Sequence, residues 1–339
     1  MSAPARTLDI ASSPHIRAGV GVDGIMFNVV LALLPVVAFA VYAFGLAALL
    51  GIAVATASCV LSEHLLCRLA GKPSTVGDWS VTITGLLYGL TLPPGLALWM
   101  VALGGFLGVA MAKFLFGGLG YNAFNPALVA RAFLQAAFPT AMTSWTAAFD
   151  AGRFTTLPAS VLAAPFMHPA PDAMSGATPL ARMKFEGELT SGVDLFLGLS
   201  AGSSGETCAL LILLGGLYLA ARRMLDWRIP AAILGTVALL SLVCHQIDPA
   251  RYAPPGFMLS AGGLMLGAVF MATDMVASPV SRLGVLLYGA LIGTLVVVIR
   301  YWGGMPEGVM YAILLGNAVS PHLDRLIQPV AFGARGRPR

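Results

Sequence analysis

The feature that most constrains this chain is a series of long stretches with almost no charged residues. A helix needs roughly 20 apolar residues to cross a bilayer, and eight runs approach that length, at 24–43, 46–67, 96–116, 121–139, 206–221, 229–247, 283–299 and 308–323. Two shorter runs, 80–92 and 258–273, are ambiguous. Only 10% of the 339 residues are charged, whereas a soluble domain carries about 25%. The sequence therefore predicts an all-α membrane protein.

Two local echoes indicate that the chain consists of two related halves. The segment LLYGLTLP at 86–93 resembles LMLGAVFM at 264–271, and the tripeptide GGL at 117–119 resembles GGM at 303–305. If both ambiguous runs cross the bilayer, each half has five spans, and the odd number inverts the second half relative to the first. Inverted repeats with broken helices near a central site occur in transporters. We expect about ten transmembrane helices in two inverted five-helix repeats, with kinked packing helices as the alternative for the ambiguous runs.

The basic residues are distributed unevenly over the loops between these runs. With ten spans both termini share one side of the membrane, and thirteen Lys and Arg residues, Lys113 among them, fall on that side. Five fall on the other side, namely Arg153, Arg182, Lys184, Arg251 and Arg300, and Arg131 lies within a span. Because positive charges accumulate in cytoplasmic loops, the termini are assigned to the cytoplasm of a bacterial inner-membrane protein. The predicted parts are a cytoplasmic tail at 1–23, a first membrane repeat at 24–139, a periplasmic segment at 140–192, a second repeat at 193–327 and a cytoplasmic tail at 328–339.

One motif in the predicted periplasmic segment carries chemistry. Residues 172–178 read D-A-M-S-G-A-T, and D-x-x-S-G-A-T is the acceptor pattern of the transferase that joins flavin mononucleotide (FMN) to a threonine hydroxyl through a phosphoester bond. The matching residues are Asp172, Ser175, Gly176, Ala177 and Thr178. A run of small residues is an ordinary surface loop in most proteins, but here the motif and the predicted periplasmic location agree. The sequence therefore predicts covalent FMN on Thr178.

The residue types of the motif suit such an attachment. Small side chains give a bulky transferase access to the backbone, and Gly176 permits a positive φ that turns neighbouring N–H groups toward a phosphate. Thr178 supplies the oxygen nucleophile, which the transferase and its metal would activate. Asp172, Ser175 and Ala177 complete the recognition motif. A covalent tether also prevents loss of a flavin that faces the periplasm.

Several ionisable residues lie in or beside the apolar runs, where a charge is costly and marks a functional candidate. Glu206 and Asp274 stand in corresponding motifs, and we expect an ion-path or flavin-site role for them first. Arg131 falls about ten residues into its predicted helix and needs a carboxylate or a flavin phosphate as its partner. Glu63 is a further candidate. The alternative for Glu63 and Asp274 is a position at the membrane interface.

Five motifs, in order along nearly the whole chain, resemble those of one family of membrane electron-transfer subunits. They are SVTITGLLYGLTLPP at 80–94, FGGLGYNAFNPALVARAFL at 116–134, DAMSGATPLA at 172–181, GETCALLILLGG at 205–216 and FMATDMVASPVSRLG at 270–284. The family includes the RnfD subunits of the Rnf ion-translocating oxidoreductase and, less similar to this chain, the NqrB subunits of the sodium-pumping NADH:quinone oxidoreductase. The quinone-reducing relative has a longer N-terminal extension, so the short segment before the first run favours the Rnf type.

The resemblance implies a ten-helix subunit with a urea-transporter-like fold and an external covalent FMN. Such a subunit relays electrons in a complex that couples electron flow between ferredoxin and NAD to sodium or proton transport. The expected partners are the iron–sulfur and flavin subunits of the Rnf complex, the flavin transferase and the lipid bilayer. A noncovalent riboflavin in the membrane part is also compatible with the resemblance, but no residues can be named for it.

Other function classes receive less support from the sequence. The basic residues are scattered over short loops instead of forming one patch, which argues against nucleic acid as a partner. The four cysteines have no metal-ligand spacing, and we expect no metal site. No glycine-rich nucleotide motif follows a strand, so we expect activity only within a multi-subunit redox-driven translocase. The rival function is a urea-transporter-like channel or transporter without redox chemistry, and a passive assembly scaffold is a third.

Overall fold

The computed structural model describes residues 21–165, 167, 177–200, 202–206 and 208–328. Within these ranges the chain is helical, with no strand. Four helices are long and apolar enough to cross a membrane: α1 (Val22–Phe44), α2 (Leu46–Leu69), α10 (Arg228–Ile247) and α13 (Arg282–Trp302). The prediction of an all-α protein with several membrane spans is therefore confirmed at this level.

Shorter helices occupy the other apolar runs. In the first half they are α3 (Ser80–Leu90), α4 (Leu98–Val109) continuing into the π-helical turn η2 (Ala110–Phe114), and α5 (Pro126–Ala137). In the second half they are α9 (Ala209–Ala221), α11 (Pro255–Ser260), α12 (Leu264–Leu266), the π-helical turn η4 (Gly267–Met271) and α14 (Val309–Leu326). Every run singled out in the sequence thus contains helix. The run at 121–139 begins its helix late, because Asn125 caps α5 by accepting hydrogen bonds from the backbone N–H groups of Ala127 and Leu128, and Pro126 suits the first helical position.

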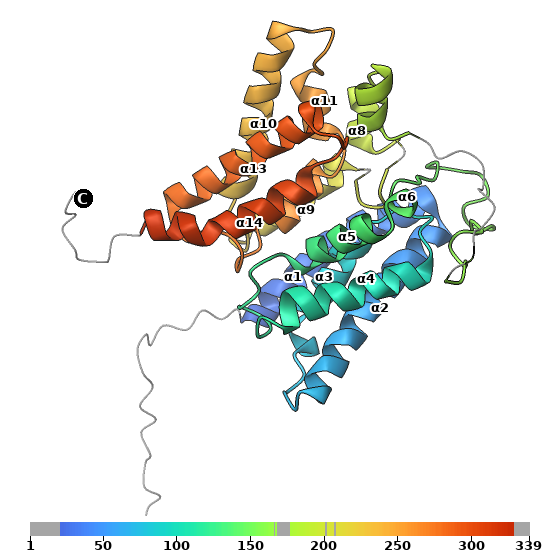
Figure 1. The fold of residues 1–339 in the computed structure, drawn as a ribbon, viewed down its shortest axis with the longest axis vertical. Helices are drawn as coiled ribbons and strands as arrows, with labels where there is room; N and C mark the ends of the chain where they lie inside the picture. The colour runs from blue at the N-terminus through green and yellow to red at the C-terminus, as the bar shows by residue number, and fades with distance from the viewer. Residues whose placement is uncertain (1–20, 166, 168–176, 201, 207, 329–339) are drawn as a thin grey trace, which may run out of the picture.

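The two halves form two groups of helices that share one continuous apolar core. In the first half α2 packs against α3 and α4, and α4 packs against α5. In the second half α10 packs against α11 and α13, and α13 packs against α14. The halves meet where α1 contacts α9 and where α5 contacts α14. Figure 1 shows α5 and α14 facing each other between the two groups.

Glycines on α3 allow it to approach α2 closely. A Cβ added to Gly85 would lie 2.5 Å from the Cα of Thr56, and one added to Gly89 would lie 2.9 Å from the Cα of Ile52. Small residues one helical turn apart let two helix backbones meet in this way, as in membrane helix pairs. The glycine-rich character of the 80–92 run therefore reflects packing. This run forms one uninterrupted helix that ends before Pro93.

The 258–273 run, unlike the 80–92 run, is broken. Helix α11 ends at Ser260, and the chain turns through Ala261 to Gly263 before α12 begins. Gly262 has a φ of +67°, which favours glycine because other L-residues are strained there. The break leaves backbone groups of this turn free to meet side chains from other elements, and the candidate site is built around it.

The predicted periplasmic segment contains only short helices where it is described. They are α6 (Pro139–Met142), α7 (Pro179–Ala181) and the π-helical turn η3 (Arg182–Glu186), followed by α8 (Gly192–Leu197). A short turn, η1 (Val76–Asp78), precedes α3. The segment with α7 and η3 lies against the second half, and this contact places Thr178 beside a cavity.

Candidate functional site

A cavity of about 470 Å³ lies between α5, the segment that contains α7 and η3, and the second half of the chain. Its wall includes Ala177 and Thr178, the two motif residues that the structure describes. The other residues of the predicted motif, Asp172, Ser175 and Gly176, lie outside the described residues. The remaining lining that matters for the chemistry is aromatic or charged, namely Trp145, Phe185, Tyr311, Arg131, Glu206 and Glu307.

Thr178 is held at the start of α7. Its Oγ1 accepts a hydrogen bond from the backbone N–H of Ala181 at 3.2 Å, and Pro179 occupies the first helical position. Both features are ordinary helix-starting signals. Pro179 and Leu180 of α7 are buried. The hydroxyl of Thr178 therefore lies on a segment that packs against the rest of the protein at the cavity wall.

One ion pair on the cavity wall joins the two halves of the chain. Arg131 of α5 places its Nη1 atom 3.3 Å from Oε1 of Glu206, and the side chains of both residues are at most 10% exposed. The sequence singled out both residues and left the partner of Arg131 open. The structure supplies this partner from 75 positions further along the chain.

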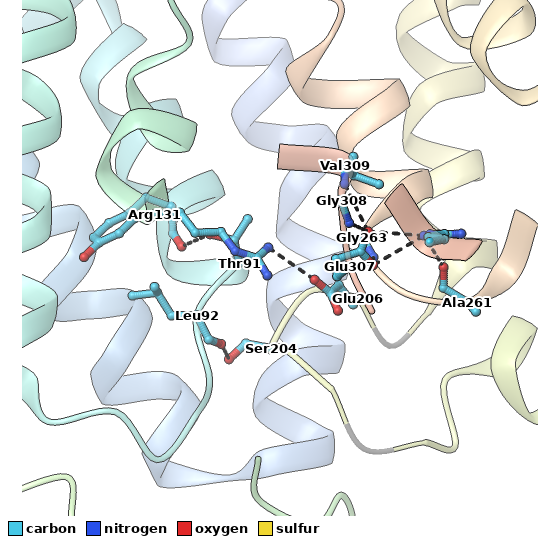
Figure 2. A network of polar contacts seen from close by, with 12 residues as sticks. Thr91, Leu92, Arg131, Ser204, Glu206, Ala261, Gly263, Glu307, Gly308 and Val309 are labelled. Carbon is cyan, nitrogen blue, oxygen red and sulfur yellow. Dashed lines mark hydrogen bonds and ion pairs between the residues drawn. The ribbon is translucent and has the colours of Figure 1, made fainter. Parts of the chain in front are cut away.

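A second ion pair lies beside the first. Arg300, in the last turn of α13, has its Nη2 atom 3.3 Å from Oε2 of Glu307 and donates to the carbonyls of Met258 and Ala261. Glu307 also accepts hydrogen bonds from the backbone N–H groups of Gly263, Gly308 and Val309. Figure 2 shows Glu206 between Arg131 and Glu307. We call these four residues, Arg131, Glu206, Glu307 and Arg300, the charge array.

The charge array is balanced, with two guanidinium groups and two carboxylates. Burying a charge is costly unless an opposite charge and hydrogen bonds compensate it, and here each carboxylate faces an arginine. The Nε atoms of Arg131 and Arg300 are nevertheless buried and have no hydrogen-bond partner among the described residues. Arg131 also lines the cavity, so its guanidinium presents a cation to a group bound there.

The loop that carries Glu206 is fastened to the end of α3. The backbone N–H and the Oγ of Ser204 both donate to the carbonyl of Leu92, at 3.1 and 3.2 Å. The N–H of Gly205 donates to the carbonyl of Leu90 at 2.6 Å. The carbonyls that α3 leaves free at its C-terminus are thereby satisfied, and Glu206 is held at a fixed place opposite Arg131 (Figure 2).

Glu63 lies in a separate buried cluster. Lys113 donates from Nζ to both carboxylate oxygens of Glu63, at 2.9 and 2.7 Å, and to Oγ of Ser80 at 2.7 Å. Thr75 adds a hydroxyl hydrogen bond to the same carboxylate. Glu63 is 3% exposed and lies inside α2, so its carboxylate is enclosed by the protein and does not face solvent.

Two of the basic residues counted toward the orientation are buried in the protein. Lys113 was counted on the cytoplasmic side and Arg300 on the opposite side, and their exposed fractions are 3% and 0%. Each lies in the last turn of a helical stretch, η2 and α13, and pairs with a glutamate. These buried ion pairs account for the positions of both cations without reference to loops. Omitting Lys113 and Arg300 removes one basic residue from each side of the membrane in the count, so the asymmetry of the basic residues persists.

Asp274 lies apart from both the charge array and the Glu63 cluster. Its carboxylate accepts a hydrogen bond from Nδ2 of Asn122 at 3.1 Å and from the backbone N–H of Val276 at 3.1 Å. It lines a smaller cavity of about 110 Å³ together with Lys113 and Asn122. Of the four predicted membrane charges, the structure therefore brings Arg131 and Glu206 together and places Glu63 and Asp274 elsewhere.

Sequence reasoning missed three residues of these sites. Glu307 and Arg300 complete the charge array, and Lys113 neutralises Glu63. The signal that could have revealed them was pairing: a carboxylate inside an apolar run requires a cation, and Lys113 and Arg300 directly adjoin the apolar runs that contain α4 and α13.

These features define a class of protein before any comparison is made. The chain is a multi-pass membrane protein in which the segment that carries Thr178 closes one side of a cavity and buried ion pairs form part of its wall. The comparisons agree with this class. A model of the NQR2, RnfD, RnfE family matches residues 9–333, and the chain belongs to this family.

Curated relatives cover almost the whole chain. A proton-translocating ferredoxin:NAD(+) oxidoreductase complex subunit from Clostridium ljungdahlii is 40% identical over 336 residues, covering 96% of both chains. A Na(+)-translocating ferredoxin:NAD(+) oxidoreductase complex subunit from Acetobacterium woodii is 41% identical and covers 96% of this chain and 95% of its own. An ion-translocating oxidoreductase complex subunit from Stutzerimonas stutzeri is 43% identical, covering 94% of both chains. The resemblance inferred from the five motifs is confirmed.

Proposed function

We propose that this chain is the membrane subunit of an ion-translocating ferredoxin:NAD oxidoreductase that carries FMN on Thr178 and relays electrons through it. Relatives of the same length that are named as the corresponding subunits of such complexes support the assignment. The single observation that carries the flavin proposal is the position of Thr178, the acceptor residue of the motif, in the wall of the cavity. A channel without redox chemistry has no support from these relatives.

The cavity suits a flavin in size and lining. Its volume of about 470 Å³ falls within the range of roughly 300–1,000 Å³ typical of small-molecule sites. Trp145, Phe185 and Tyr311 provide aromatic surface for a flat ring, and the guanidinium of Arg131, which lines the cavity, provides cationic donors for a ring oxygen or nitrogen. When bound, FMN would accept a pair of electrons and release them one at a time. The protein would hold the ring, exclude water and set its potential.

The membrane topology of this proposal comprises ten crossings in two inverted repeats of urea-transporter-like architecture. Corresponding helices of the two halves make corresponding contacts, since α2, α3, α4 and α5 pack in the same order as α10, α11, α13 and α14. The sequence echoes fit the same order of elements: one relates the end of α3 to α12 and η4, which follow α11, and the other follows η2 and α13. The proposed location is the bacterial inner membrane, with residues 140–192 in the periplasm.

The intramembrane charges receive distinct roles in this proposal. Arg131 and Glu206 belong to the flavin site, because they line the cavity with Thr178. Asp274 has no cationic partner among the described residues and remains the candidate for an ion path. Glu63 is neutralised by Lys113, so its first role is structural. Since the relatives are named as translocating protons in one case and sodium in another, either ion is compatible with the fold.

The proposed partners are the other subunits of the oxidoreductase complex and, during maturation, the flavin transferase. Assembly with these subunits explains why no nucleotide-binding motif is needed in this chain. A passive scaffold would assemble in the same way without carrying electrons. Electron transfer measured at equal subunit composition, with and without the flavin on Thr178, separates the two roles.

The experiment that tests the proposal is coexpression of the chain with its flavin transferase, followed by a denaturing gel and mass spectrometry of the peptide that contains Thr178. The wild-type band should fluoresce, and the peptide should carry the mass of FMN. Thr178→Val should abolish both signals. Thr143→Val is the matched control, because Thr143 lines the same cavity but lies outside the motif, and it should retain the flavin. An unmodified wild-type peptide from native membranes would refute the proposal.

The predicted orientation needs a separate test. A reporter enzyme that is active only in the periplasm, fused after residue 165, should show activity, because this position lies in the segment proposed to face outward. The same reporter after residue 328 should be inactive. Activity in the opposite pattern would reverse the orientation and remove the periplasmic flavin.

A further inference from the structure

The short segment that follows Thr178 is docked on the second half of the chain. Leu180 is 2% exposed and belongs to the continuous apolar core, and Met183 packs against that core. Arg182 in the same segment remains about half exposed, and its contacts with Glu186 and Glu188 are long, at 3.8 Å. The segment therefore has one face that binds the protein and one that faces outward.

Lys184 makes the strongest polar contact of this segment. Its Nζ lies within hydrogen-bond distance of two carbonyl oxygens in the last turn of α13, those of Ile299 at 3.3 Å and Arg300 at 3.0 Å. It also reaches two carbonyl oxygens in the loop that follows, those of Gly303 at 2.5 Å and Met305 at 3.0 Å. The carbonyls in the last turn of a helix form the negative end of its dipole. An ammonium group with three donors suits this position.

The same helix end is held from its buried side by the charge array. Arg300 belongs to the last turn of α13 and pairs with Glu307, whereas the carbonyl of Arg300 accepts from Lys184. The external segment and the wall of the cavity thus meet on one helical turn. A displacement of Lys184 would separate the attachment residue from the groups that face a bound flavin.

We propose that Lys184 is a positioning residue, which locks the segment carrying Thr178 onto the last turn of α13 so that a flavin esterified to Thr178 is held at a fixed place in the cavity. This inference rests on the proposed function, because it requires the flavin on Thr178. Lys184 itself takes no part in attachment, since the motif that the transferase recognises ends six residues before it.

The role of Lys184 can be tested with a matched pair of variants in the complete complex. Lys184→Met removes the ammonium group and keeps most of the side-chain volume. Arg182→Met removes a charge two residues away from a side chain that is about half exposed. Both variants should carry covalent flavin, which the denaturing gel verifies. The measurements are quenching of flavin fluorescence by acrylamide, a neutral quencher, and the midpoint potential of the covalent flavin.

Lys184→Met should increase the population of molecules with an accessible flavin at least about tenfold, because hydrogen bonds to a charged donor are stronger than average. Its midpoint potential should move away from the wild-type value, whereas Arg182→Met should match the wild type in both measurements. Lys184→Arg, which retains a cationic donor, should restore both values. If the complex that contains Lys184→Met fails to assemble, Lys184→Gln should show the same changes in quenching and potential, with smaller magnitudes.

Two different failures are distinguishable. Absence of flavin from the wild-type chain would overturn the proposed function and this inference with it. Flavin present on the Lys184→Met and Lys184→Gln variants, with quenching and potential equal to wild type, would overturn this inference alone and leave the proposed function standing.

Discussion

The buried pair between Lys113 and Glu63 allows a direct test of whether Glu63 is structural. The two side chains are each 4% exposed, with Nζ and Oε2 at 2.7 Å. Removing one member of a buried pair leaves the other charge uncompensated and costs about 3–5 kcal/mol, whereas replacing both with apolar residues is often neutral. Lys113→Met and Glu63→Met alone should therefore each destabilise the chain, and the double variant should recover most of the loss.

The assay uses the thiols of the chain. Cys59, Cys67 and Cys208 are buried and unpaired, so a thiol-reactive dye reports thermal unfolding in detergent. The transition temperature should fall by about 2 °C per kcal/mol, which is the lower end of the range for domains of about 150–250 residues. Each single variant should therefore lower the transition temperature by roughly 6–10 °C. Single variants as stable as wild type, or a double variant no better than the singles, would refute the reasoning. A double variant that is stable but defective in ion transport would indicate that Glu63 takes part in the ion path.

Two further predictions follow from the site. Gly262→Ala should destabilise the chain by roughly 1–3 kcal/mol or more, because a residue with a side chain is strained at a φ of +67°. A Cβ at Gly256 meets open space, so Gly256→Ala should leave the dye-monitored transition unchanged or higher. Arg131→Gln should lower the midpoint potential of the flavin by roughly 30 mV or more, the two-electron equivalent of 1.4 kcal/mol, because a cation beside the ring is lost; Gln135→Leu, in the same cavity, should not change it in a redox titration.

The helices were largely predictable, because a bilayer requires long apolar runs and this chain has them. The break in the 258–273 run was also visible in its glycines. The limits of α5 were less accessible, since the capping by Asn125 depends on local hydrogen bonds within a run that is apolar throughout. Whether each short helix completes a membrane crossing depends on the loops and on neighbouring helices, which hydropathy alone does not describe.

The candidate site was predictable only in part. Thr178 was identified from a local motif, and Arg131 and Glu206 from the cost of charges in apolar runs. Their pairing joins residues far apart in the chain, and nothing in one sequence reveals such a contact. Arg300 and Lys113 were interpreted only as topological signals, and their buried pairing with glutamates was not predicted. Lys184 was read in the same way, although its ammonium group contacts the end of α13.

The ion pair between Arg131 and Glu206 has a consequence for motion. Transporters built from two repeats move one repeat against the other to expose their site alternately to each side. In this chain a movement of one half against the other would pull apart the buried pair that joins them, and each charge would lose the partner that compensates its burial. A scaffold braced in this way suits a redox centre, which works at fixed separation from its donor and acceptor, better than it suits a carrier that must open and close.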